Sequence, residues 1–191
     1  YMPLDPTWVP FCRELWSSAE QQQNYLPGVP EGSDLCITPV SAPENHYVRI
    51  KADNRLDADG TLRGTFTLTA EGQSDSNIRR IFTTGFQSEW KSTMERQLLA
   101  ISPKARLLSV DYGKNPKYYQ AAPIKITFRY EIPDYALRGE GEMFFRPMVM
   151  NNLYNQVRSY MWIDTSVENR KYGFKDGCSR LVELDETIQL P

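Results

Sequence analysis

Histidine, cysteine and long apolar runs are all scarce in this 191-residue sequence. There is one histidine, and the three cysteines lie far apart with no C-x-x-C pair: His46, Cys12, Cys36 and Cys178. A structural zinc site draws most of its ligands from these two residue types, and a disulfide-stabilised domain needs closely spaced cysteines in even number. No apolar run approaches the ~20 residues of a membrane-spanning helix. The sequence therefore predicts no metal, no cofactor and no membrane span, and three buried, unreactive thiols, with one disulfide plus one free thiol as the alternative.

An excess of charge of either sign is also missing. The formal net charge is -2, from 22 basic and 24 acidic residues. A nucleic-acid partner is therefore not expected, because no overall positive field would attract one. Two small basic clusters, Arg79-Arg80 and 104–117, are interpreted as solvated surface. The hydrophobic content of 40% is typical of a globular domain, and a chain of this length buries roughly 70% of its unfolded surface.

The first 43 residues differ in composition from the rest. They hold seven of the thirteen prolines and a run of three glutamines. Proline cannot donate to a β-ladder, so this part is predicted to be irregular, with short strands at 1–4 and 34–38. The stretch 41–45 is predicted to join it to the main domain. The domain boundaries that follow are 1–43 and 44–191.

The second part alternates as strands do, with one helical interruption. Residues 47–56 and 61–70 have period two around an Asp-Ala-Asp-Gly turn, and 74–84 and 87–101 have helical spacing after the candidate caps Ser74, Asp75 and Ser76. Further strands are expected at 105–112, 124–132, 139–149 and 178–190, the last with a possible break at Asp185-Glu186, while 151–165 is ambiguous between helix and loop. This predicts an α+β, mainly β fold: an antiparallel sheet or open β-sandwich with a two-helix insertion at about residues 74–101.

Asp5 is the one candidate for a catalytic side chain. It stands in Asp5-Pro6-Thr7, after a short apolar stretch and between aromatic residues. A cysteine nucleophile needs an imidazole to move its proton and a third group to orient that imidazole, and an aspartate at a strand end can be that group. An aspartate that initiates a turn is the other interpretation.

Residues 1–11 resemble the end of the core of transglutaminase-like cysteine peptidases and acyltransferases, where this aspartate completes a Cys-His-Asp triad. The similarity continues through Tyr25-Leu26-Pro27-Gly28-Val29-Pro30-Glu31-Gly32. Residues 46–191 look like the β-rich domain of unknown function that follows the core in exported bacterial members. The resemblance implies that the nucleophilic cysteine and the histidine precede the aspartate, so we expect this chain to begin inside a catalytic domain and to carry only Asp5.

The expected function is therefore that of a non-catalytic accessory domain. The resemblance implies that its partner is the transglutaminase-like core of the same polypeptide and that it lies in the periplasm or cell envelope. The chain as given is not expected to be an enzyme. A local triad of Cys36, His46 and Asp5 is the catalytic alternative.

A binding module for glycan or peptide is the second function considered. Exposed aromatic side chains would form its platform, and Trp162 is the first to test among Tyr112, Tyr118, Tyr119, Tyr154, Tyr160 and Trp162. Asp53, Asp57 and Asp59 before Gly60 resemble a calcium loop in part. Their spacing and the missing closing glutamate do not fit an EF-hand, so a hairpin turn is favoured over weak calcium binding.

Overall fold

The computed structural model describes residues 18–119, 122–151, 168–169, 171 and 178–191. The strand predicted at 1–4 and nearly all of the ambiguous segment 151–165 lie outside the described residues.

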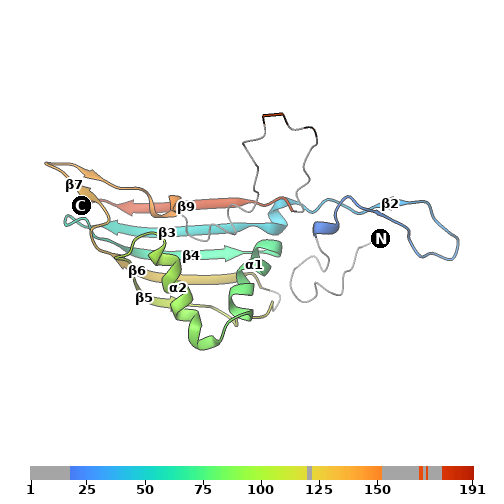
Figure 1. Ribbon diagram of the computed structural model, residues 1–191, viewed down its shortest axis with the longest axis horizontal. Helices are drawn as coiled ribbons and strands as arrows, with labels where there is room; N and C mark the ends of the chain where they lie inside the picture. The colour runs from blue at the N-terminus through green and yellow to red at the C-terminus, as the bar shows by residue number, and fades with distance from the viewer. Residues whose placement is uncertain (1–17, 120–121, 152–167, 170, 172–177) are drawn as a thin grey trace.

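A five-stranded sheet forms the centre of the structure (Figure 1). Its strand order is β5-β6-β4-β3-β9. The strands are β3 (Val48–Leu56), β4 (Leu62–Ala70), β5 (Arg106–Asp111), β6 (Ile124–Ile132) and β9 (Val182–Gln189). All of them fall within stretches that the sequence pattern predicts as strands, and the Asp-Gly turn joins β3 to β4 as expected.

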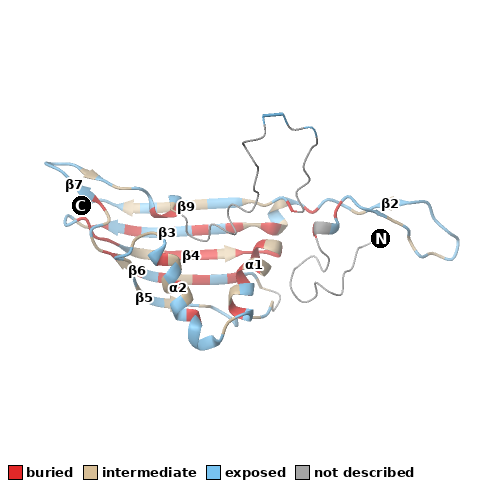
Figure 2. Cartoon of the chain, viewed as in Figure 1, coloured by how far each residue is buried: buried red, intermediate tan, exposed pale blue. Residues whose placement is uncertain are grey.

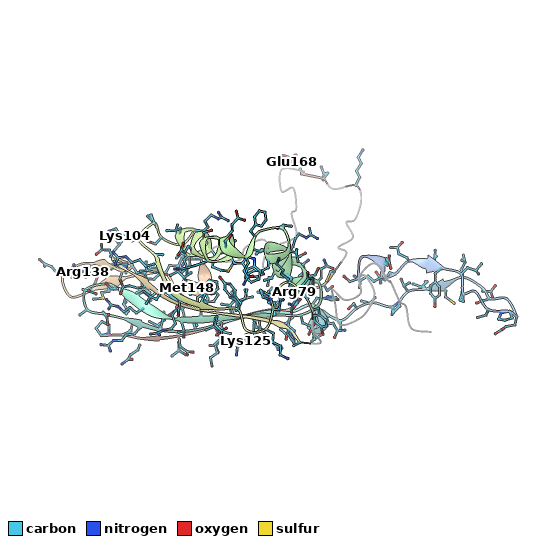
Figure 3. The ribbon with its side chains drawn as sticks, turned by 90° about the horizontal axis from the view of Figure 1, so that it is seen from below. Arg79, Lys104, Lys125, Arg138, Met148 and Glu168 are labelled. Atoms are coloured by element: carbon cyan, nitrogen blue, oxygen red, sulfur yellow. The ribbon has the colours of Figure 1, made fainter. Side chains whose placement is uncertain are left out.

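The described residues cover only one face of this sheet. Along β3 buried and exposed residues alternate without exception, so every second side chain enters the core. Helices α1 (Gly72–Thr83) and α2 (Trp90–Leu99), the latter after a 3-10 turn η3 (Gln87–Glu89), pack on the buried face (Figures 2 and 3). The predicted helical stripe of α2 is buried, and Phe66 stacks on Phe128 in the core at 4.4 Å between ring centroids. The fold is thus α+β and mainly β.

Two details of the predicted architecture need correction. Strand β9 runs parallel to β3, so the sheet is mixed and not antiparallel throughout. A second sheet does not oppose the first among the described residues; the helices take that place, which gives two layers and not a sandwich. The open face is accordingly polar, and Lys125 projects from it away from the helices (Figure 3).

The long strand predicted at 139–149 is wrong. The structure has a short hairpin of β7 (Leu137–Arg138) and β8 (Met143–Phe144), followed by the 3-10 turn η4 (Met148–Met150). Gly141 has a φ of +78°, and Pro147 has no N–H to donate. These residues end the strand pattern early, and η4 instead places the buried Met148 against the sheet layer.

Strand β9 has no break at Asp185-Glu186, because Glu186 has partners on the buried face. Its Oε1 accepts a hydrogen bond from Asn54 Nδ2 at 2.6 Å, and its Oε2 accepts one from the Val149 N–H at 3.0 Å. The Tyr130 hydroxyl donates to Asn54 Oδ1. A polar side chain therefore stays in the strand by joining a hydrogen-bond network above β3 and β6.

Helix α1 begins earlier than the predicted caps. Glu71 is its N-cap and accepts from the Gly72 N–H, while Ser74 and Asp75 are buried within the helix. Asp75 binds Arg79 one turn later through both carboxylate oxygens, at 2.5 and 3.1 Å. Arg79 in turn donates to four backbone carbonyls of the loop before β6, those of Asn115, Pro116, Tyr118 and Ala122. The interpretation of Arg79-Arg80 as solvated surface is therefore correct for Arg80, which is exposed, and wrong for Arg79, which is buried. The Arg79 side chain, here termed the clamp, joins helix α1 to the loop before β6.

The burial of Asp75 beside Arg79 predicts that the stability of the fold depends on pH. Burial raises the pKa of Asp75 from 3.8 to about 6, against the opposing effect of Arg79. An acid with a higher pKa when folded binds more protons in that state, so the stabilisation is present at low pH and is lost as pH rises from 3.8 to about 6. We expect the unfolding free energy of the wild type, minus that of Asp75→Asn, to fall by about 2–3 kcal/mol between pH 4 and pH 7. Urea denaturation at each pH measures it; a difference that rises over this range would contradict the pKa direction.

The residues before the sheet form an arm (18–42) that projects from one end of the sheet (Figure 1). It contains η1 (Ser18–Glu20) and a two-residue ladder of β1 (Asn24–Tyr25) with β2 (Cys36–Ile37), the centre of the strand predicted at 34–38. A 3-10 turn, η2 (Pro43–His46), connects the arm to β3. This turn lies where the sequence predicts the junction.

Candidate functional site

The predicted triad residues do not come together within the described part of the chain. Asp5 and Cys12 lie outside the described residues. Cys36 is in β2 on the arm, half-buried, with its thiol 3.7 Å from the Asp34 carbonyl oxygen. His46 lies at the base of the arm and has other partners. The Cys36–His46–Asp5 alternative therefore gains no support from the described geometry.

A different cysteine meets the histidine. His46 and Cys178 belong to a group of five buried side chains, here termed the His46 cluster, that fills the junction between arm and sheet. Each is no more than 5% exposed. The members are Ser18, Gln21, Ser41, His46 and Cys178. Polar side chains are expensive to bury unless they are hydrogen-bonded, so their convergence from four separate segments makes this the candidate site.

The parallel pairing of β9 with β3 brings His46 and Cys178 together. Val48 pairs with Val182, and the Val48 N–H donates to the Leu181 carbonyl at 2.8 Å. Parallel strands enter a sheet from the same end, so the residues that precede both strands share one corner. The sequence pattern predicts each strand but carries no signal for this pairing, which is why His46 and Cys178 were not matched.

The hydrogen bonds of the His46 ring define its tautomer. Nδ1 lies 3.0 Å from the Gln73 backbone nitrogen, which can only donate. Nδ1 is therefore the acceptor and has no proton, so the neutral ring has its proton on Nε2. Nε2 lies 2.6 Å from the Ser41 hydroxyl oxygen. The Ser41 N–H donates to Gln21 Oε1 at 3.0 Å, which holds the hydroxyl in place.

The surroundings of Cys178 change the pKa of its thiol. Its burial, the largest single effect, opposes ionisation, but hydrogen bonds from His46 and Ser18, together with the charges of His46 and Arg180, lower the pKa of Cys178. Stabilising the thiolate in this way is one requirement for a reactive cysteine.

The ring cannot meet the second requirement in this arrangement. A catalytic histidine needs an unprotonated nitrogen toward the nucleophile and an acceptor behind it that stabilises the imidazolium. In the His46 cluster the nitrogen near Ser41 has the proton, and the group behind the ring is an N–H donor. A proton on Nδ1 would face the Gln73 N–H, so two hydrogen-bond donors would point at each other. The described geometry therefore fits a hydrogen-bonded junction that anchors the arm.

The Asp-Ala-Asp-Gly turn has the hairpin chemistry favoured by the sequence. Asp59 accepts from the Thr61 N–H at 2.9 Å, and Asp57 pairs with Arg55 and Arg63. Among the described residues no group of three or more His, Cys, Asp or Glu side chains could hold a metal ion. The carboxylates of Asp57 and Asp59 are both used within the turn and its strands.

The aromatic residues proposed as a ligand platform are dispersed. Trp162, Tyr154 and Tyr160 lie outside the described residues. Tyr112 packs edge-on against the rings of Phe82 and Trp90 in the core, with centroids 5.7 and 5.5 Å away. Tyr119 faces the Arg79 guanidinium and Tyr118 is 54% exposed. No described helix has both the length and the apolar character that crossing a membrane requires.

Three exposed or half-exposed features are therefore left as surfaces: the apolar arm, the open sheet face, and the outer side of the helices. No protein-family model, curated protein or solved structure matches this chain.

Proposed function

We propose that this chain is a non-catalytic accessory domain of an exported transglutaminase-like protein, and that its arm docks on the core of that polypeptide. The apolar surface of the arm carries the proposal. Four large aliphatic side chains there are each at least 60% exposed: Leu26, Leu35, Ile37 and Val40.

Apolar side chains gathered on one narrow projection are typical of a surface that another part of the protein covers. The arm directly continues the segment 1–11, whose Asp5-Pro6-Thr7 resembles the end of a transglutaminase core. A core that ends with this segment would lie close to the arm by chain connectivity alone. Chain connectivity and exposed apolar surface thus favour the same occupant.

The His46 cluster supports the same interpretation from the other end of the arm. Its hydrogen bonds join Ser41 and Gln21 of the arm to His46 at the edge of the sheet. A rigid base would hold the arm in one direction, which reduces the entropy lost when it docks. The donor behind the His46 ring also argues against an independent cysteine hydrolase.

The docking proposal predicts a loss of contact when arm residues become charged. In a polypeptide that carries the proposed core before Tyr1, the arm amides should be protected from hydrogen exchange, and Leu35→Asp with Ile37→Asp should remove that protection. Covering one such side chain is worth about 1.5–3 kcal/mol, so the docked state should weaken more than tenfold. Because both side chains are already 68% and 66% exposed, the melting temperature of the 191-residue chain should barely change.

The matched control is Leu137→Asp, which charges a residue 74% exposed at the far end of the sheet and should leave arm protection unchanged. Equal exchange of the arm amides with and without the upstream residues would refute docking. An upstream coding sequence without a cysteine at a helix start and a histidine on a strand would refute the transglutaminase-like origin. Turnover by this chain alone, lost in Cys178→Ala or Cys36→Ala, would refute the non-catalytic role.

A further inference from the structure

We propose that the open face of the sheet binds a small acidic saccharide in a groove centred on Thr65. This open-face groove has a volume of about 520 Å³ and crosses all five strands of the sheet. Its size lies within the range of small-ligand sites. It is on the opposite side of the sheet from the helices and does not involve the arm, so it is independent of the docking proposed above.

The groove exists because a short side chain stands among long ones. Thr65 of β4 lies between Asp53 of β3 and Arg129 of β6 in one cross-strand row. Adjacent strands are roughly 4.8 Å apart, so the carboxylate and the guanidinium rise on either side of Thr65 from backbones about 10 Å apart. The row therefore presents an acceptor and a cation across a gap that one sugar ring can bridge.

Arg129 is available to an anion. It is exposed and forms no ion pair with any described residue, and the same is true of Asp53. By contrast, the next row is internally neutralised in part: Asp57 joins Arg55 to Arg63, and Glu131 joins Arg63 to Arg106. Three arginines share two carboxylates there, which leaves one positive charge.

The neighbourhood of Arg129 and Arg63 favours a single carboxylate. Arg63 is the diagonal neighbour of Arg129 on β4, but its guanidinium is already shared by Asp57 and Glu131, so Arg129 is the cation left for a bound anion. Asp53 limits the net charge of the groove to a small positive value. This balance suits a ligand with one negative charge better than a polyphosphate.

The rest of the lining selects hydroxyl groups over apolar surface. Thr187 and Gln189 of β9 line the groove on the far side of β3, where Thr187 pairs with Asp53. Among the described lining residues Leu108 is the one large aliphatic side chain, and none offers an aromatic ring for a base to stack on, because Tyr130 has its side chain fully buried on the other face. Asp, Gln, Thr and Arg side chains together bond both the donors and the acceptors of sugar hydroxyls. A uronic acid unit combines these hydroxyls with the single carboxylate.

Titration calorimetry and saturation-transfer NMR with galacturonate, a sugar acid with one carboxylate, test the proposal. We expect saturable binding that Arg129→Gln weakens about tenfold or more, because a charge-assisted hydrogen bond is lost. The control is Lys125→Gln, which removes a cation that forms no ion pair with any described residue and lies on the same strand and face but outside the groove. Both positions are exposed, so folding should not change.

Three outcomes would overturn the inference. One is the absence of saturable binding. Another is an equal loss in Lys125→Gln, which would indicate general attraction to a charged face. A third is equal affinity for galactose, the neutral counterpart of galacturonate, which would exclude recognition of the carboxylate. Since none of these measurements involves the arm, they leave the accessory-domain proposal untouched.

Discussion

Replacing Arg79 with methionine is expected to lower the free energy of unfolding by about 4 kcal/mol. The guanidinium is 4% exposed and binds Asp75 together with four loop carbonyls. Methionine fills much of the volume but leaves the Asp75 carboxylate buried without its counter-charge, and it leaves the carbonyls without donors. Breaking one side of a buried ion pair costs more than the pair contributes, because the remaining group is still desolvated. Urea denaturation followed by circular dichroism gives the difference.

Neighbouring substitutions distinguish the clamp from a general effect of charge. Arg80→Met removes an exposed arginine from the same helix and should change stability by less than about 0.5 kcal/mol. Replacing both partners, Arg79→Met with Asp75→Leu, should cost clearly less than the sum of the single changes, since no isolated charge is left. If Arg79→Met were within 1 kcal/mol of the wild type, the clamp would be shown to contribute nothing.

Replacing Gly72 with alanine is expected to cost about 3 kcal/mol or more. Gly72 has a φ of +59°, and a Cβ at this position would lie 2.2 Å from the Asn45 carbonyl oxygen and 2.4 Å from His46 Nδ1. The left-handed conformation alone costs about 1–2 kcal/mol for alanine. The contact adds to it because one of the two clashing atoms belongs to the backbone, so side-chain rotation cannot relieve it. Chemical denaturation measures the loss.

The Gly72 substitution should also disturb the His46 cluster. The added methyl occupies the space in which Nδ1 accepts the Gln73 N–H, so the ring should shift, and its NMR chemical shifts should change together with those of the arm. Gly28→Ala is the control, because no atom lies within 4 Å of its Cβ and its φ is not positive. A Gly72→Ala protein with wild-type stability and unchanged His46 resonances would contradict the packing described between Gly72 and His46.

The sequence predicts the strands of the large sheet well because their pattern is strong and local. In β3 and β6 each alternate residue enters the core, so period two is readable directly. The same reasoning leaves one long strand or two short ones open at Asp185-Glu186, where two acidic residues interrupt the pattern. There Glu186 is retained in β9 by Asn54 and the Val149 N–H, and such long-range partners leave no trace in a local pattern.

The sequence identifies individual residues of the candidate site but does not predict which of them come together. A lone histidine at a domain junction could be noted from sequence, and so could each cysteine. Whether Cys178 or Cys36 meets His46 depends on the direction in which β9 enters the sheet, and both directions satisfy the same alternation of side chains. The role of the His46 ring depends on a single hydrogen bond. Its Nδ1 faces the Gln73 N–H, which is a donor, whereas a catalytic triad needs an acceptor at this position. The open-face groove likewise depends on cross-strand register, which places Thr65 between Asp53 and Arg129.

The parallel pairing of β3 with β9 has a consequence for the order of folding. The strand that begins at Val48 has β4 as one neighbour, available at once, and has to wait for residues 182–189 as the other. During synthesis on the ribosome, the hairpin of β3 and β4 therefore emerges with one long edge unpaired, an aggregation-prone arrangement. Closing such a distant contact is also slow, because a large loop has to be ordered first. The sheet is therefore completed only after β9 has been synthesised, and until then the outer edge of β3 stays exposed.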